Sequence, residues 1–528
     1  VAEYAKSLPY VEYVTDNLYT CSQDTQDAMK KVIREHNLNR IVVAACTPKT
    51  HEPLFQETMA DAGLNKYLFE MANIRNHDSW VHSSDPAMAT EKAKDLVRMA
   101  VAKVALLEPL AEPELSVTRR ALVLGGGVAG MTAALSLADQ GYPVHVVESG
   151  AQLGGQALRL HSTWRGEDIA AFVEQLRQRV NAHERITVHL NARLSQVEGF
   201  VGNFKSVIQN GAEPVTVEHG VAIIATGGRE WKPDEYLYGQ HPGVLTHLEL
   251  DEKLRANDPA LAHAKSVVFI QCVGSREPQR PYCSRVCCTH TLQSALEIKR
   301  RSPDTNVYVL YRDIRSYGDR EILYHEARRA GVLFIRYSLE DKPKVTTLNG
   351  TLTVTVTDHI LRRPLVLPAD FVTLATAVLP NVDEALAQLF KVPINEDGFL
   401  VEAHAKLRPV DFATDGVFLC GLAHYPKPLD ESIAQAQAAA ARAATVLARD
   451  RVHFPGTVAR VNPFLCSACG TCVAICPYSA PRFNERGVAE INPALCKGCG
   501  LCVASCRSGA IQLQGFDDAQ ILTMIDSL

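Results

Sequence analysis

Two runs of cysteines near the C-terminus have the spacing of iron–sulfur ligands. The pattern C-x2-C-x2-C-x3-C occurs twice, and the first run is followed directly by Pro477. In this pattern three thiolates converge on one cubane while the fourth crosses to its twin. We therefore expect two [4Fe-4S] clusters. The predicted ligands of one are Cys466, Cys469, Cys472 and Cys506, and those of the other are Cys496, Cys499, Cys502 and Cys476.

Zinc is the alternative occupant of these cysteines. It prefers closed four-ligand sites built from separated pairs, which this spacing does not resemble. Arg507 stands where the second run would have proline, and its positive charge should favour the reduced clusters.

A third group of cysteines lies in the middle of the chain. An apolar strand that begins at Val267 runs into a turn with Cys272, and Cys283, Cys287 and Cys288 complete four thiols within 17 residues. The alternatives are a vicinal disulfide at the Cys-Cys pair and a redox dithiol acting on a flavin, which would need the absent C-x-x-C. We predict an iron–sulfur cluster, because thiolates this close together in a reducing cytosol usually bind metal.

A strand, a glycine turn, a helix and a second strand make up a complete βαβ unit after residue 118. Gly125 permits the tight turn, Gly127 lets the backbone approach a pyrophosphate, and Gly130 lets helix and strand pack closely. Glu148 ends the second strand, where a carboxylate can accept hydrogen bonds from ribose hydroxyls. This context predicts nucleotide binding; a glycine turn that only packs is the alternative.

Two later segments indicate that the nucleotide is a flavin. The apolar strand Val221 to Gly228 ends in Ala-Thr-Gly, as in flavoproteins with two dinucleotide domains. The segment Asp415 to Ala441 is a strand, a loop and a long alanine-rich helix, whose positive end would stabilise reduced flavin. That class usually has aspartate after the glycine, where this chain has Leu422. The residues expected at the flavin are Thr226, Gly227, Gly421, Lys427 and Ser432.

The intervening segment 265–368 has the strand and helix order of a second nucleotide domain. Its first strand is followed by Cys-Val-Gly-Ser-Arg, with one glycine where a nicotinamide fingerprint needs three. The strand Phe371 to Ala377 ends in a weakened version of the Ala-Thr-Gly run. We therefore do not expect direct nicotinamide binding.

Composition narrows the class of protein. A hydrophobic fraction of 47% and a charged fraction of 21% are ordinary for a globular protein of several domains. The net charge of −5 and the lack of a basic block argue against nucleic acid as a partner. No apolar run reaches the roughly 18 residues of a membrane span, and no signal pattern opens the chain. We expect a cytoplasmic protein with residues upstream of Val1.

The predicted fold class is α/β. Twelve of the fifteen cysteines fall in the three clusters, which disfavours a disulfide scaffold. The predicted domains are an N-terminal α/β domain (1–107), a discontinuous FAD-binding domain (118–264 and 369–452), a degenerate nucleotide-binding-like domain with the central cysteines (265–368) and a ferredoxin-like 2[4Fe-4S] domain (456–528). Two prolines and three glutamates mark a linker at Glu108 to Ser116.

Several segments resemble the A-subunit of heterodisulfide reductase and its bacterial relatives, which include flavoprotein subunits of quinone-interacting membrane-bound oxidoreductase complexes. The segments that carry the resemblance are AACTPKTHEPLF, NIRNHDSWVH, EKAKDLVRMAVAK, FIQCVGSRE, RPYCSRVCC and the double ferredoxin. The resemblance implies FAD in a thioredoxin-reductase-like fold, a cluster at Cys272, Cys283, Cys287 and Cys288, and an electron hub in a larger complex. Family members can divide electron pairs between high- and low-potential acceptors.

The chain departs from this family at two positions that matter. Asp78 stands where members often have cysteine, which puts a cluster in the N-terminal domain in doubt, although Cys21 and Cys46 could contribute. Gln293 stands near the flavin where bifurcating members carry lysine, and an amide cannot supply that charge. Lys427 is a partial replacement for it. No additional ferredoxin follows Gly154-Gly155.

The main hypothesis is therefore an oxidoreductase subunit in which FAD handles electron pairs and clusters pass single electrons to partner subunits. Implied partners are subunits like heterodisulfide reductase B and C, or a hydrogenase, formate or NADH dehydrogenase module, and the complex could be a homodimer. The rivals are a self-sufficient NAD(P)H:ferredoxin-type reductase and an assembly scaffold whose cofactors are structural.

Overall fold

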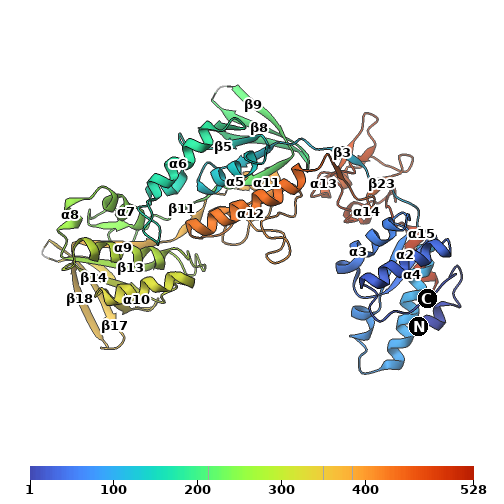
Figure 1. Cartoon of the computed structure of the whole chain (residues 1–528), viewed down its shortest axis with the longest axis horizontal. Coiled ribbons are helices and arrows are strands. Elements are labelled where there is room, and N and C mark those ends of the chain that lie inside the picture. The colour runs from blue at the N-terminus through green and yellow to red at the C-terminus, as the bar shows by residue number, and fades with distance from the viewer. Residues whose placement is uncertain (212, 349, 383) are drawn as a thin grey trace. The chain divides into compact units, whose positions relative to one another are not determined.

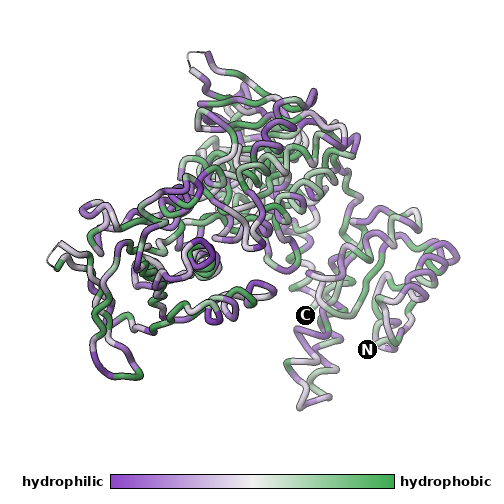
Figure 2. The backbone as a smooth tube through the Cα atoms, turned by 60° about the vertical axis from the view of Figure 1, so that its left-hand side comes forward, coloured by the Kyte–Doolittle hydropathy of each residue, from purple (hydrophilic) through white to green (hydrophobic). Residues whose placement is uncertain are grey.

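The chain folds into two compact units (Figure 1). A computed structural model describes residues 1–211, 213–348, 350–382 and 384–528. The smaller unit comprises Val1–Leu115 and His453–Leu528, and the larger comprises Ser116–Val452. Within the larger unit, hydrophobic stretches of backbone gather in the interior and hydrophilic stretches run along the outside (Figure 2).

The first half of the larger unit is built on a parallel sheet in the order β21-β10-β4-β5-β6. Its strands are β4 (Ala121–Leu124), β5 (Val144–Val147), β6 (Ile186–His189), β10 (Val221–Ile224) and β21 (Val417–Leu419). Helices α5 (Val128–Ala138), α6 (Ile169–Ala182) and α12 (Leu429–Leu447) cover one face. The antiparallel strands β7 (Arg193–Phe200), β8 (Asn203–Asn210) and β9 (Glu213–His219) cover the other. Strands β4, β10 and β21 are apolar throughout because both of their faces are buried.

The second half repeats this plan on a parallel sheet in the order β12-β19-β13-β14-β15. Its strands are β12 (Val244–Thr246), β13 (Ser266–Val273), β14 (Asn306–Tyr311), β15 (Leu333–Arg336) and β19 (Phe371–Thr376). Helices α7 (His247–Arg255), α9 (Cys287–Arg301) and α10 (Glu321–Arg329) cover one face. Strands β16 (Lys344–Leu348), β17 (Thr351–Asp358) and β18 (Arg363–Ala369) cover the other. The sheet draws β12 and β19 from outside the segment 265–368.

Two short crossing strands join the halves. β11 (Gly228–Glu230) pairs antiparallel with β20 (Val378–Pro380), directly after the two strands that end in Ala-Thr. The two parallel sheets and their crossing strands confirm the predicted α/β class with two dinucleotide-type domains.

The smaller unit combines the N-terminal segment with the ferredoxin segment. Parallel strands β1 (Ile41–Ala45) and β2 (Phe69–Asn73) pack with α2 (Gln23–Glu35), α3 (Pro48–Asp61) and α4 (Pro86–Ala105). The ferredoxin segment contains β23 (Ala459–Val461) paired with β26 (Ile511–Leu513), and β24 (Pro481–Phe483) paired with β25 (Ala489–Ile491). Its two short helices are α13 (Thr471–Ile475) and α14 (Leu501–Ala504).

A buried lysine joins these two segments. Lys103 on α4 is 2% exposed, and its ammonium lies 2.7 Å from Glu70 Oε2 and 3.8 Å from the centre of the Phe516 ring. Helix α15 (Asp518–Asp526) packs along α4, where Gln520 Nε2 donates to the Leu106 carbonyl oxygen at 3.2 Å. The two segments, predicted as separate domains, therefore form a single compact unit.

Two histidines with lowered pKa values, His145 and His219, lie within the first half of the larger unit. His219 is fully buried: its Nδ1 lies 2.9 Å from the Val221 carbonyl oxygen, and its Nε2 lies 2.8 Å from Ser206 Oγ. Burial lowers the pKa of His219 to about 4 and that of His145 to about 4. Both rings are therefore neutral in the folded protein.

None of the helices within the described residues has the length and apolarity that a bilayer crossing demands.

We expect Lys103→Met to lower the free energy of unfolding of the smaller unit by about 1–3 kcal/mol, because Glu70 loses its partner and the Phe516 ring loses its cation. Denaturant unfolding of the full chain measures this. Lys94→Met on the same helix removes a surface pair with Glu91 and should cost less than about 1 kcal/mol. Equal losses in both variants would contradict the role of Lys103.

We expect the larger unit to lose stability as the pH falls from about 6.5, the unfolded pKa of histidine, to about 4, the folded pKa of His219. The unfolded chain binds protons in this window that the folded one excludes, at up to about 1.4 kcal/mol per pH unit for each histidine. His219→Gln should flatten the dependence measured by unfolding at several pH values, whereas exposed His359→Gln should leave it unchanged.

Candidate functional site

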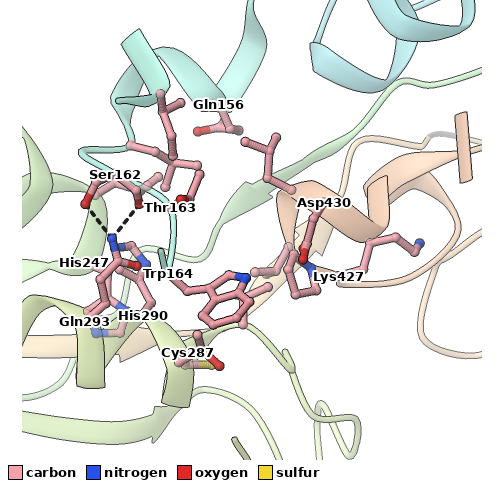
Figure 3. A pocket seen from close by; sticks show the side chains of 18 of the residues that line it. Gln156, Ser162, Thr163, Trp164, His247, Cys287, His290, Gln293, Lys427 and Asp430 are labelled. Carbon is pink, nitrogen blue, oxygen red and sulfur yellow. Dashed lines mark hydrogen bonds between the residues drawn. The ribbon is translucent and has the colours of Figure 1, made fainter. Parts of the chain in front are cut away.

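A cavity of about 520 Å³ lies within the larger unit, with walls from both of its halves (Figure 3). The first half contributes Gln156, the loop that follows it, and the start of α12 with Lys427. The second half contributes Cys287, His290 and Gln293 from one helix, α9. The cavity therefore brings the predicted flavin region and one central cysteine to the same space.

The glycine turn has the geometry expected of a dinucleotide site. Gly125 has a φ of +105°, and a Cβ there would lie 2.2 Å from the Ala225 carbonyl oxygen; a Cβ on Gly130 would lie 1.8 Å from the Gly125 carbonyl oxygen. Both positions therefore require glycine for close packing. A Cβ on Gly127, at the start of α5, would meet nothing within 4 Å. The space beside the start of α5 is therefore open, as anion binding at a helix N-terminus requires.

Glu148 lies beside this turn at the end of β5. Its Oε2 accepts a hydrogen bond from the Gly126 N–H and its Oε1 one from the Gly150 N–H, both at 2.6 Å. The carboxylate is thus fixed next to the glycine turn, where a ribose hydroxyl would reach it.

Buried polar atoms without partners mark the space around the turn and the cavity. Within the described residues, Gln156 Oε1, Thr226 Oγ1 and Thr289 Oγ1 are buried and have no hydrogen-bond partner. An isolated parallel bridge joins Gly127 to Gly154, which leads into the short helix Gly155–Arg159 that carries Gln156. A flavin dinucleotide offers carbonyl, imide and hydroxyl groups for such atoms, so the residues present fit this cofactor.

The loop before α12 is held by a buried lysine. Lys427 Nζ donates to the carbonyl oxygens of Gly421 at 2.6 Å and Tyr425 at 2.8 Å, and burial lowers its pKa to about 8. Gly421 N–H donates to Gln435 Oε1 at 2.9 Å. The Ser432 hydroxyl bonds back to the Pro428 carbonyl oxygen, so it serves the helix start rather than the cavity wall.

The four central thiols surround the junction of β13 and α9. Cys272 lies in β13 itself, which runs on to Val273 through a register shift, and has a φ of +61°. Cys287 and Cys288 occupy the first turn of α9. Burial raises the pKa of Cys287 well above its usual value and that of Cys288 to about 12. The neighbouring cysteines add a smaller effect in the same direction. The thiols of Cys287 and Cys288 are therefore neutral until a metal displaces their protons.

Hydrogen-bond donors face two of these thiols. Arg276 Nη1 lies 3.8 Å from Cys272 Sγ, and the Arg285 backbone N–H lies 3.3 Å from Cys283 Sγ. Such donors stabilise thiolate ligands and tune a cluster.

Several contacts at the cavity join residues that no sequence motif links. Gln293 Nε2 donates to both the carbonyl oxygen and Oγ of Ser162 at 2.6 Å (Figure 3). Asp251 pairs with His290 at 2.9 Å, which raises the pKa of His290 against the opposing effect of burial. No residue spacing in the sequence points to the loop 160–168 or to the start of α7. These segments meet Gln293 and His290 only in the folded unit.

The ferredoxin cysteines gather around two short helices. α13 begins after Gly470 and α14 after Gly500, and both glycines have a left-handed backbone conformation. α13 carries Cys472 of the first run in its first turn, and α14 carries Cys502 of the second. A hydrogen bond with the Thr471 hydroxyl lowers the pKa of Cys469 to about 7, whereas burial raises that of Cys502 to about 11. In the described part of the chain, no three potential ligands converge on a single ion. A cubane spreads its thiolates over four irons.

Asp78 lies on the π-helical turn Arg75–Ser79 of the smaller unit. It is 2% exposed, and its Oδ1 has no hydrogen-bond partner among the described residues. Cys46 follows β1 and is buried, whereas Cys21 is exposed.

Two protein-family models match the chain. The pyridine nucleotide-disulphide oxidoreductase model matches residues 119–270, and the 4Fe-4S dicluster domain model matches residues 465–510. A solved thioredoxin reductase from Lactococcus lactis is 16% identical and covers 63% of this chain and 99% of its own, at a TM-score of 0.45.

Curated relatives extend over nearly the whole chain. The A-subunit of the H(2):CoB-CoM heterodisulfide,ferredoxin reductase of Methanothermobacter marburgensis is 37% identical over 92% of this chain and 88% of its own length. An iron-sulfur A-subunit of the CoB–CoM heterodisulfide reductase of Methanopyrus kandleri is 33% identical over 100% and 94%. The protein is thus an oxidoreductase with a flavoprotein domain and a 4Fe-4S ferredoxin domain. The chain belongs to the family of heterodisulfide reductase A-subunits.

Proposed function

We propose that this chain is the FAD- and iron–sulfur-containing electron-transfer subunit of a heterodisulfide-reductase-like complex. FAD handles electron pairs, and three [4Fe-4S] clusters pass single electrons to partner subunits. The observation that carries the proposal is the shared cavity: Cys287 of the central thiol group lines the same space as Gln156 and Lys427. A cluster at these thiols would be the immediate exit or entry for electrons at the flavin.

The protein's contribution is to bind and orient the cofactors and to tune their reduction potentials. Gly125, Gly127 and Gly130 shape the proposed phosphate site, and Glu148 lies where the ribose would bind. Thr226 and Gly227 precede Gly228, and Gly421 precedes Leu422; both following residues line the cavity. When bound, FAD supplies two-electron chemistry that the clusters cannot. The α12 start and Lys427 bring positive charge to the cavity, which favours reduced flavin.

The proposed ligands of the central cluster are Cys272, Cys283, Cys287 and Cys288. The remaining two clusters take the eight ferredoxin cysteines in the crossed pattern given by their spacing. Burial favours the neutral form of Cys287 and Cys288, so metal binding would have to displace their protons.

The relatives' names indicate the surroundings in which the chain works. They describe subunits of reductases that act on the CoB-CoM heterodisulfide, and one name adds ferredoxin. We infer that this chain also works as one component of a multi-subunit redox complex, inside the cell. The electron donor module, whether of hydrogenase, formate dehydrogenase or NADH dehydrogenase type, would be a partner chain.

Direct nicotinamide binding in the second half has little structural support. After β13 the single glycine of the turn, Gly274, packs against Trp231, whose ring a Cβ would approach to 2.1 Å. Thirteen residues, 274–286, then separate the strand from α9. A dinucleotide turn instead passes directly from strand to helix.

Electron bifurcation through the family's lysine is likewise not available at Gln293. The Gln293 amide is engaged with Ser162 and carries no charge. Lys427 is the cation of the cavity wall on the α12 side, but its ammonium is held by two carbonyl oxygens.

We expect the purified chain to contain about twelve irons and matching sulfide, as three cubanes require. Cys287→Ser should leave about eight irons and remove one low-temperature EPR signal on reduction, with flavin retained. Cys420→Ala, a buried cysteine outside the three groups, should leave the iron content unchanged. A wild-type count near that of two cubanes would contradict the central cluster.

We expect Gly127→Val to lower the affinity of the chain for FAD by about 100-fold, because the new side chain would fill the open space at the start of α5. Equilibrium titration of the deflavinated protein measures this. Iron content and denaturant unfolding should stay at wild-type values, since nothing lies within 4 Å of the added Cβ. If the flavin-free variant still carried electrons through its complex, the structural-scaffold hypothesis would replace the proposal.

A further inference from the structure

The loop 160–168, called here the Trp164 loop, forms one wall of the cavity. It lies between the short helix that carries Gln156 and α6, and seven of its nine residues face the cavity. Figure 3 shows the Trp164 ring between Cys287 on one side and Lys427 and Asp430 on the other. Trp164, Cys287 and Lys427 all line the cavity, so the indole faces the space that they share.

Contacts from the second half fix this loop. Gln293 on α9 donates to Ser162 twice at 2.6 Å, and the His161 N–H donates to Asp251 Oδ2 on α7 at 3.0 Å. Within the loop, Thr163 Oγ1 donates to Glu167 Oε2 at 2.7 Å. The loop is thus held in place across the cavity by the half of the unit that carries the central thiols.

The Trp164 ring itself is braced on several sides. It packs against the hydrophobic core of the second half, and the Arg165 guanidinium lies 4.7 Å and that of Arg320 5.8 Å from its centre. A large, braced aromatic ring is an efficient barrier to small molecules, because a side chain with fixed neighbours opens few transient gaps.

We propose that Trp164 is a specificity-determining residue that keeps dioxygen from the reduced flavin, so that electrons leave through the thiol group at Cys287. This rests on the proposed function, which places flavin in the cavity. Dioxygen would otherwise take two electrons and one proton from the reduced flavin and a second proton from water, leaving oxidised flavin and hydrogen peroxide. The packing of the Trp164 loop makes this side reaction slow.

The test compares peroxide formation by the reduced, flavin-loaded full chain mixed with dissolved dioxygen. Trp164→Ala should raise the rate about tenfold or more, and Trp164→Phe should restore most of the protection. Trp80→Ala, the same substitution at an exposed tryptophan in the smaller unit, should leave the rate unchanged.

A second readout needs no turnover. The visible absorption band of oxidised flavin loses its fine structure when water reaches the ring, so Trp164→Ala should blunt that band and Trp80→Ala should not. If Trp164→Ala fails to fold or to hold flavin, Gln293→Ala tests the same barrier by freeing Ser162, and its peroxide rate should also rise.

The proposal would be overturned if a flavin-loaded Trp164→Ala variant kept the wild-type peroxide rate and band shape. Where Trp164→Ala cannot be loaded with flavin, the same result in Gln293→Ala would overturn it. That result leaves the proposed function standing, since flavin and clusters would still exchange electrons. A wild-type chain that binds no FAD would instead overturn the proposed function itself.

Discussion

Ion pairs between the start of α12 and the second half of the larger unit hold the cavity walls together. Arg320, whose side chain is 9% exposed, contacts both carboxylate oxygens of Asp430 at 2.8 and 2.7 Å. Arg285 pairs with Glu431 at 3.1 Å, and Tyr317 donates to the same carboxylate. Loss of Asp430 would take this partner from the nearly buried Arg320 guanidinium, so these contacts resist separation of the halves.

This arrangement explains why the central cysteines sit where they do. A strand end and a helix start are rigid elements, and they place Cys272 and Cys287 with less freedom than a loop would. The same helix presents Gln293 to the Trp164 loop two turns later. One element thus carries Cys287, a proposed cluster ligand, and a brace for the opposite wall, which couples the geometry of the thiol group to that of the cavity.

In the smaller unit, contacts between two segments stabilise the ferredoxin segment. A ferredoxin segment of this size has a small core, to which several of its own cysteines contribute. Its helix α15 adds stability by packing on α4, with Lys103 buried between Glu70 and Phe516. The N-terminal segment therefore serves as a support for the ferredoxin segment.

The sequence alone determined the ferredoxin clusters and the dinucleotide turn, because both depend on short local spacing: thiols a few residues apart, and glycines where a Cβ would collide. It also indicated the α/β class, because buried parallel strands are short apolar runs. It could not place Gln293 against Ser162, give Trp164 a position beside Cys287, or join Lys103 to Phe516. Those contacts link residues 131, 123 and 413 positions apart in sequence, and no local pattern records them. Only the packing of one half against the other decided what the walls of the cavity are made of.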